Sequence, residues 1–169
     1  ARSPALPEPR LGTVTPTDEI TAHLHTEKEA GNTTVALETV APYKFEPDNS
    51  AARLRDLPRT LALQMLNRRL SVLAKQPGAP FLSGLVGVTE QFDFFRNASI
   101  ELNCRPDQWS AALAVAEQEL RRALEHGFLP EELAEAVAGM KNQLAQAVRT
   151  APTRRSPTLA DALVDDILG

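Results

Sequence analysis

Four short runs of this chain have the pattern of β-strands, and the first and last of them alternate apolar and polar side chains as a strand with one buried face does. The runs cover residues 19–28, 33–41, 81–92 and 97–104. Gly31 and Asn32 supply turn chemistry between the first two runs, so these runs are expected to form a hairpin. Only residues 93–96 separate the last two runs, which predicts a second hairpin.

Helical periodicity lies between and after these strands. Between Ser50 and Gln76 the apolar residues occupy a broad arc, which predicts a buried helix. Pro58 is expected either at a kink or in the first turn of a helix that begins near Asp56. A second helix is expected after Pro106, with Asp107 as its cap. Its buried stripe is predicted to comprise Trp109, Leu113, Ala116, Leu120 and Leu124.

A third amphipathic helix is predicted to begin near Pro130, and a short final helix to cover residues 158–168. The apolar stripe of the third helix comprises Leu133, Val137, Met140, Leu144 and Val148. The elements then follow the order strand, strand, helix, strand, strand and three helices. This order predicts an α+β fold, with an antiparallel sheet of about four strands and helices packed on one face.

Composition and charge narrow the class of protein. The 169 residues are 43% hydrophobic and 24% charged, which is typical of one globular domain. The formal net charge of −4 gives no reason to expect a nucleic acid as a partner. No apolar run approaches the ~18 residues of a membrane-spanning helix, so no membrane partner is expected either. The Pro-rich residues 1–18 are predicted to be a linker, and residues 19–169 to form the α+β domain.

The histidines do not form a recognisable metal site. They are His23, His25 and His126, and none stands in a His-x-x-Glu-His helix of the kind that binds catalytic zinc. His23 and His25 share a predicted strand face and could touch one metal ion, but an exposed polar pair is the favoured interpretation. His126 falls in the last turn of a predicted helix, where a ring that can become cationic suits the helix dipole. No metal ligand is therefore assigned.

Other candidate groups also favour structural roles. Cys104 lies on an apolar strand face, which is typical of a buried and unreactive thiol. The pair Glu131-Glu132 suits a helix N-terminus, and Asp165-Asp166 suits a solvated helix face. The sequence contains no Gly-x-Ser-x-Gly turn, phosphate loop or Gly-rich dinucleotide turn. No catalytic or cofactor-binding residue is predicted.

The boundary between the second and third helices is the most specific feature of the sequence. Gly127 can take the left-handed conformation that ends a helix, and Pro130 suits a first helical turn. The stretch from Gly127 to Leu133 resembles the junction Gly-(Phe/Val/Ile)-(Ser/Thr)-x-Glu-Glu-Leu of the M16 metallopeptidases, the pitrilysin, insulysin and mitochondrial processing peptidase group. Leu129 departs from this pattern, because the family has Ser or Thr at that position.

The resemblance extends from the first predicted hairpin to residues 156–160. It includes the segment from Leu66 to Leu70, which is similar to the family's Asn/Ser-Arg-Leu segment. Two roles are considered for Arg68 and Arg69. They either tie the helix to a neighbouring loop or contact the substrate. The resemblance implies a LuxS/MPP-like metallohydrolase fold. It also implies a domain that is incomplete at its C-terminus, because the family's last helix and strand would lie beyond residue 169.

Family members pair a zinc-bearing catalytic domain with a related domain that lacks the zinc motif, and their lobes enclose a chamber for peptides. The resemblance therefore implies a non-catalytic domain of a zinc endopeptidase, inactive alone, with zinc held by the parent's catalytic domain. Its expected partners are that domain or a related lobe, the peptide substrate and, through an exposed sheet edge, another copy. The alternative is an inactive subunit or scaffold that binds a separate catalytic partner. Bacterial family members are often periplasmic, so that compartment is an expectation.

Overall fold

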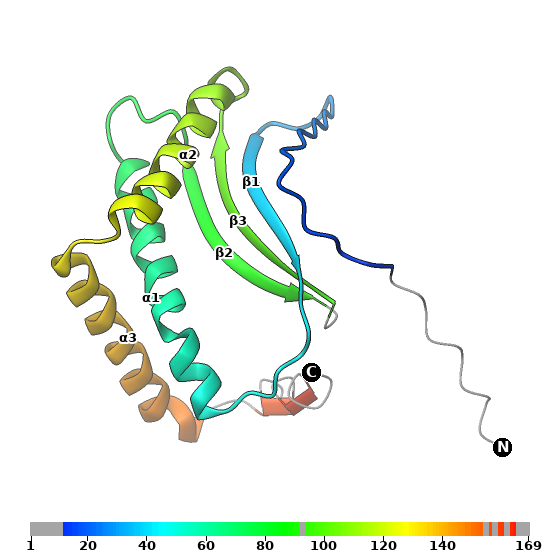
Figure 1. Cartoon of the computed structure of the whole chain (residues 1–169). Helices are drawn as coiled ribbons and strands as arrows, with labels where there is room; N and C mark the ends of the chain where they lie inside the picture. The colour runs from blue at the N-terminus through cyan, green and yellow to red at the C-terminus, as the bar shows by residue number, and fades with distance from the viewer. Residues whose placement is uncertain (1–11, 92–93, 154–155, 157–158, 161–162, 165–169) are drawn as a thin grey trace.

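A three-stranded antiparallel sheet carries helices α1 and α2 on one face, and α3 packs against α1 (Figure 1). The structure, a computed structural model, describes residues 12–91, 94–153, 156, 159–160 and 163–164. The strands are β1 (Thr33–Pro42), β2 (Ser83–Gln91) and β3 (Phe95–Cys104). The helices are α1 (Ser50–Leu73), α2 (Trp109–His126) and α3 (Pro130–Thr150), with short 3₁₀ turns at Pro106–Gln108 and Ala151–Thr153. The predicted α+β class and the one-sided helix layer are confirmed.

The strand order in the sheet is β1-β3-β2, so the last strand in sequence occupies the centre. Leu37 of β1, Ile100 of β3 and Val86 of β2 lie in one row across the sheet. Gln91 pairs with Phe95, which confirms the second predicted hairpin. Because β1 and β2 both pair only with β3 among the described residues, each of them forms an edge of the sheet.

The hydrophobic core lies between the sheet and the first two helices. Its fully buried members come from α1, β3 and α2, and the alternation along β3 places every second side chain in it. Small residues on α2 allow the helix to approach the strands closely. The buried cluster comprises Leu66, Leu70, Phe81, Val86, Ile100, Leu102, Cys104, Ala112 and Ala116.

The predicted strand at residues 19–28, and with it the first hairpin, is wrong. These residues form no ladder with β1 and are exposed throughout, with Ile20 at 100% and Leu24 at 90%. The chain turns just before the predicted Gly31-Asn32 turn, since the amide of Ala30 donates to the carbonyl of Glu27 at 3.3 Å. Alternation alone cannot create a strand, because a strand also needs a partner to satisfy its backbone groups.

Helix α1 begins at Ser50 and runs through Pro58, so the alternative start near Asp56 is wrong. Asn49 caps the helix: its side-chain oxygen accepts hydrogen bonds from the amides of Ala51 and Ala52, each at 3.0 Å. This cap holds the first two turns in place although Pro58 cannot donate a hydrogen bond to the preceding turn.

Helix α2 differs from its prediction in its cap and in its buried stripe. The residue before the helix is Gln108, no side chain caps it, and Asp107 lies within the preceding 3₁₀ turn. Trp109 and Leu124 are 52% and 78% exposed, so they do not belong to the core. The buried face instead centres on Ala112, Ala116 and Glu119. The predicted apolar stripe is rotated about the helix axis relative to the buried face, toward the larger side chains. The size of a side chain does not indicate which flank of the helix a neighbouring element covers.

Helix α3 projects beyond its contact with α1. Val137 and Met140 are partly buried, whereas Leu133, Leu144 and Val148 are 44%, 61% and 74% exposed. The predicted final helix at residues 158–168 lies largely outside the described residues. Among the helices that the structure describes, none is long and apolar enough to cross a membrane.

Gly127 ends α2 with φ +67° and ψ −143°, a positive φ as predicted but an extended ψ rather than the left-handed helical value. Its amide donates to the carbonyl of Ala123 at 3.0 Å. Gly127→Ala is expected to lower the free energy of unfolding by about 1–2 kcal/mol, because a Cβ disfavours positive φ. Gly139→Ala is the matched control inside α3, where nothing lies within 4 Å of an added Cβ. That variant should gain about 0.5–1 kcal/mol in denaturant melts. Equal effects of the two variants would contradict the assignment.

Leu129 stands at the cap position of α3 and is 57% exposed, and its side chain accepts no hydrogen bond. The reciprocal bond is present, since the carboxylate of Glu132 accepts from the Leu129 amide at 2.8 Å. Leu129→Ser supplies the missing oxygen and is expected to stabilise the domain by about 0.5–1 kcal/mol. Chemical denaturation of both proteins measures the gain, and Leu129→Ala, which cannot accept a hydrogen bond, should not show it.

Candidate functional site

The histidines and the cysteine lie at positions that do not favour metal binding or a reactive thiol. His23 and His25 lie in the exposed stretch before β1, where the Nε2 atom of His25 is 2.9 Å from the Glu27 carboxylate. Their predicted common strand face does not exist. The Sγ atom of Cys104 is buried 3.5 Å from the carbonyl oxygen of Thr33, and burial raises the pKa of this thiol. A raised thiol pKa disfavours the reactive thiolate. His126 is exposed at the end of α2, as expected.

Arg69 joins α1 to the α2–α3 junction. Its Nε and Nη2 atoms donate to the two oxygens of Glu132 at 2.5 and 2.7 Å, which makes a bidentate ion pair. The same Nη2 donates to the carbonyl of Gly127 at 3.0 Å, and the guanidinium lies 4.6 Å from the ring centroid of Phe128. Of the two roles expected for Arg69 from the sequence, these contacts are those of the structural tie between the helix and a neighbouring loop.

This ion pair is largely removed from solvent. The side chains of Arg69 and Glu132 are 10% and 23% exposed. Hydrogen bonding to Arg69, together with the smaller effect of the Leu129 amide, lowers the pKa of Glu132 from 4.5 to about 2. Glu119, buried on α2, adds a favourable charge interaction with Arg69. Glu132 thus has a tertiary role in addition to the helix-dipole role predicted from sequence.

The neighbouring arginine behaves differently although it is adjacent in sequence. Arg68 pairs with Glu135 of α3 at 3.0 Å, but the two side chains are 56% and 62% exposed. Exposed pairs of this kind contribute little to stability, because water screens the charges and the side chains lose freedom. Arg69, not Arg68, is therefore the residue that fixes the junction.

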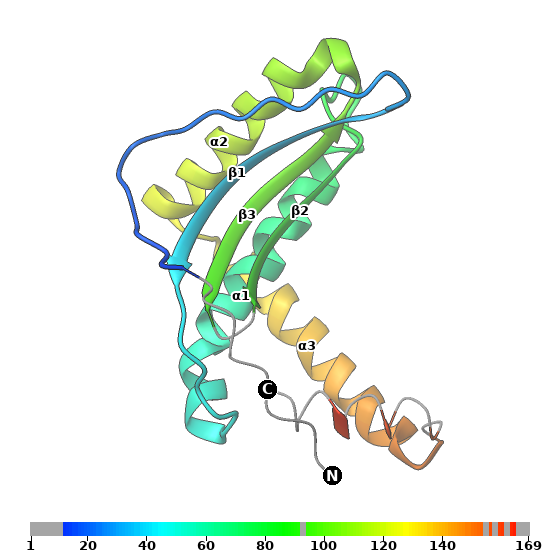
Figure 2. The same ribbon diagram turned by 90° about the vertical axis from the view of Figure 1, so that its right-hand side faces the viewer.

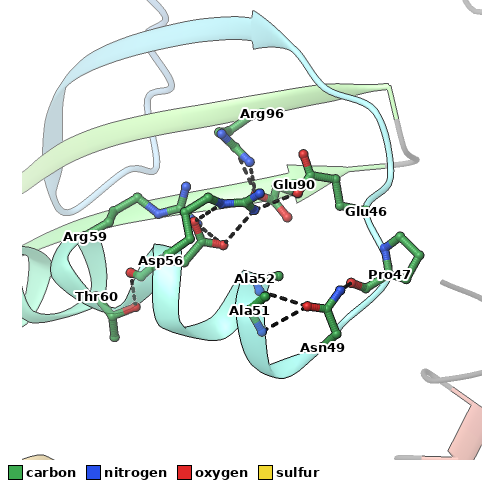
Figure 3. A network of polar contacts seen from close by, with 11 residues as sticks. Glu46, Pro47, Asn49, Ala51, Ala52, Asp56, Arg59, Thr60, Glu90 and Arg96 are labelled. Atoms are coloured by element: carbon green, nitrogen blue, oxygen red, sulfur yellow. Dashed lines mark hydrogen bonds and ion pairs between the residues drawn. The ribbon is translucent and has the colours of Figure 1, made fainter.

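A charged cleft of about 320 Å³ lies where the β1–α1 loop, the start of α1 and the end of the β2–β3 hairpin meet (Figure 3). No sequence pattern predicted this cleft. Arg96 of β3 pairs with Glu90 of β2 and stacks 4.9 Å from the ring centroid of Tyr43. Burial, followed by the neighbouring Glu90, raises the pKa of Tyr43. In the sequence, this site was indicated only by the charged residues that stand close together on either side of the predicted hairpin turn.

The wall of this cleft formed by α1 is internally paired. Arg55 contacts Glu46 at 2.6 Å and Asp56 at 3.4 Å, and Arg59 contacts Asp56 at 3.5 Å. These bonds hold the β1–α1 loop against the helix. Each carboxylate that lines the cleft is paired with an arginine.

The second face of the sheet carries no described helix, as Figures 1 and 2 show. Alternation along the strands places polar and small side chains there, with Leu85 63% and Val40 42% exposed. The Oδ1 atom of Asn97 on this face has no hydrogen-bond partner among the described residues. An extended polypeptide could lie on such a surface, where the Ser99 hydroxyl donates a hydrogen bond to the Glu101 carboxylate at 3.3 Å.

The chain's own residues do not fit the zinc site that an M16 catalytic domain requires. No histidine has the His-x-x-Glu-His context, and the described part of the chain contains no cluster of three or more His, Cys, Asp or Glu side chains that could hold a metal ion. The charged cleft does not change this conclusion, because its carboxylates are paired with arginines.

Solved protease structures share this fold. The first half of the periplasmic protease PqqL from Escherichia coli matches 81% of this chain and 29% of its own, with 20% identity and a TM-score of 0.71. The structure of PqqL itself matches 81% of this chain and 15% of its own, with 20% identity and a TM-score of 0.69. A predicted insulinase family protease from Yersinia pestis matches 82% of this chain and 30% of its own, with 19% identity and a TM-score of 0.68.

This chain therefore spans less than a third of each of these proteins. Its helices and strands have the arrangement of an M16-like domain, as the resemblance in sequence implied. No family model matches the sequence, and no curated protein is significantly similar to it.

Proposed function

We propose that this chain is a non-catalytic domain of an M16 insulinase-type zinc endopeptidase, where it walls the peptide chamber and supports the catalytic domain. The fold shared with PqqL and the Yersinia pestis protein supports a protease-family domain. The absence of a His-x-x-Glu-His segment from the sequence supports the non-catalytic role. Zinc would then be bound by another domain or lobe. PqqL is periplasmic, and we propose the same compartment for this protein.

The contacts of Arg69 are the observation that carries this proposal. Two segments that carry the sequence resemblance lie far apart in the chain, one around Arg69 and the other from Gly127 to Leu133. In the structure, Arg69 contacts Gly127, Phe128 and Glu132 of the second segment. The two segments therefore form one junction in the folded chain, which supports the proposal.

The second face of the sheet, which carries no described helix, is the surface proposed to line the chamber. Its polar and small side chains can accept an extended peptide without presenting a large apolar patch to solvent. Leu85 of the edge strand β2 projects from this face and is 63% exposed, which makes it a suitable residue to test contact. No step of peptide hydrolysis is assigned to any residue of this chain.

Nuclear magnetic resonance titration with a reduced and carboxymethylated unfolded peptide tests this role. We expect amide shifts on the outer positions of β1, β2 and β3, and weaker binding by Leu85→Lys. Arg68→Ala, altered on the helix side, is the control and should bind as the wild type does. Shifts restricted to the helices would contradict the proposed chamber wall.

The chain alone is expected to hydrolyse no peptide and to bind no stoichiometric zinc. Elemental analysis and a peptidase assay of the purified protein measure both properties. One tightly bound zinc per chain, lost in His23→Ala or His25→Ala, together with hydrolysis, would assign catalysis to this chain and overturn the proposal. A His-x-x-Glu-His segment in the upstream reading frame would favour a domain of one protease over a separate inactive subunit.

A further inference from the structure

The two edges of the sheet differ in a way that the sequence pattern does not indicate. At the β2 edge, the side-chain amide of Asn67 donates to the carbonyl of Val86 and accepts from its amide, both at 2.8 Å. A carboxamide has the donor and acceptor of a peptide group, so Asn67 occupies the position that an added strand would use. Helix α1 also packs against β2. An added strand would therefore have to displace Asn67 from the middle of this edge.

The β1 edge is open among the described residues. In an antiparallel ladder, directly opposed residues alternate between pairs that exchange backbone hydrogen bonds and pairs that do not. Val86 directs its N–H and C=O to Asn67, so its pair with Ile100 is one that exchanges no backbone hydrogen bonds. Ile100 consequently bonds toward Leu37, and every second residue of β1 directs its N–H and C=O away from the sheet. No backbone hydrogen bond from a described residue reaches these groups. They belong to Thr34, Ala36, Glu38 and Val40.

An apolar flank of α2 lies on the same side as this open edge. Figure 2 shows α2 on the β1 side of the helix layer and α1 on the β2 side. Val115 lines a small cavity together with Leu73 of α1, so its flank of α2 faces α1. At 100° per residue, Trp109 and Leu124 lie on the opposite flank, and they are 52% and 78% exposed.

We propose that a second copy of this chain pairs with β1 through its own β1, antiparallel and two-fold symmetric about Leu37, to form a continuous six-stranded sheet. This register bonds Ala36 to Glu38 of the second copy and Thr34 to its Val40, so every outward N–H and C=O is satisfied. It also avoids placing the two Glu38 carboxylates directly opposite each other. The exposed α2 flanks of the two copies then approach one another.

The β2 edge, whose middle is occupied by Asn67, limits the size of the assembly. A sheet with two open edges could add copies without limit, whereas a sheet with one open edge can pair only once. The association therefore stops at a dimer. The stretch at residues 19–28 does not compete in this structure, since it makes no hydrogen bond to β1.

Sedimentation equilibrium of the full chain over a wide concentration range tests the proposal. The expected result is a reversible monomer–dimer equilibrium without larger species. Ala36→Pro should abolish the dimer, because it removes an outward N–H while all bonds from β1 to β3 are kept. Ala36→Val, which keeps the N–H, is the matched control and should still form dimers. A strict monomer at the highest concentration, or a dimer unaffected by Ala36→Pro, overturns the proposal.

Two further variants keep the test valid if Ala36→Pro fails to fold. Trp109→Glu, altered on the exposed flank of α2, should weaken the dimer without changing the circular dichroism spectrum. Removal of residues 1–28 should leave the dimer intact. Loss of the dimer in that truncation would assign the pairing strand to residues 19–28 and overturn the proposed β1–β1 pairing. Neither result depends on peptide binding, so failure here is distinguishable from failure of the proposed chamber role.

Discussion

Arg69→Ala is expected to lower the free energy of unfolding by about 3–5 kcal/mol, the largest effect of any single change proposed here. The variant leaves the Glu132 carboxylate, which is 23% exposed, without its guanidinium partner. It also removes the hydrogen bond to the Gly127 carbonyl and the contact with Phe128. Because three elements meet at this side chain, the loss should appear as a lower midpoint in urea denaturation.

Arg68→Ala is the control for this prediction. Its pair with Glu135 is exposed on both sides, so the variant should lose at most about 1 kcal/mol. A double-mutant cycle with Arg69→Ala and Glu132→Ala then isolates the coupling between the two buried side chains. Similar losses for Arg68→Ala and Arg69→Ala would show that the junction does not depend on the buried pair.

The same ion pair predicts a dependence of stability on pH. Because the pKa of Glu132 is lowered from 4.5 to about 2, its contribution is present above pH 4.5 and is lost as the pH falls toward 2. At 1.36 kcal/mol per unit, the pair contributes about 3 kcal/mol over this window. The wild type should therefore lose more stability between these pH values than Glu132→Gln, which cannot titrate. Parallel pH profiles of the two proteins would contradict the assignment.

Gly84→Ala is expected to destabilise the domain by up to about 3 kcal/mol. An added Cβ would overlap the Leu102 side chain and lie 3.1 Å from the Cδ1 atom of Leu70. Both leucines are 0% exposed, so neither can move without disturbing the core between the sheet and α1. Thermal and chemical denaturation measure the loss.

Gly87→Ala, three residues further along β2, is the matched control. Nothing lies within 4 Å of a Cβ added there. The variant should keep or slightly raise the stability, because alanine has less freedom than glycine in the unfolded chain. If both glycines tolerate alanine equally, the close packing of β2 on Leu102 is not rigid.

Local pattern determined much of this fold. Periodicity predicted the three strands that form and the three long helices, because a strand or helix with one buried face repeats its apolar residues at a fixed interval. Gly127 and Pro130 marked the boundary between α2 and α3, because each has a backbone restriction that suits only a few positions. The absence of catalytic histidine spacing likewise followed from the sequence alone.

Tertiary structure decided which of these features have partners. Residues 19–28 alternate as a strand does, yet they remain exposed, because pairing depends on a second strand and not on the pattern. Trp109 is apolar but 52% exposed, because α2 packs on the sheet through Ala112 and Ala116. Arg69 and Glu132 are 63 residues apart, and Asn67 closes the strand edge at Val86, 19 residues away. Such contacts require the folded chain to bring distant groups together, so no local sequence signal specifies them.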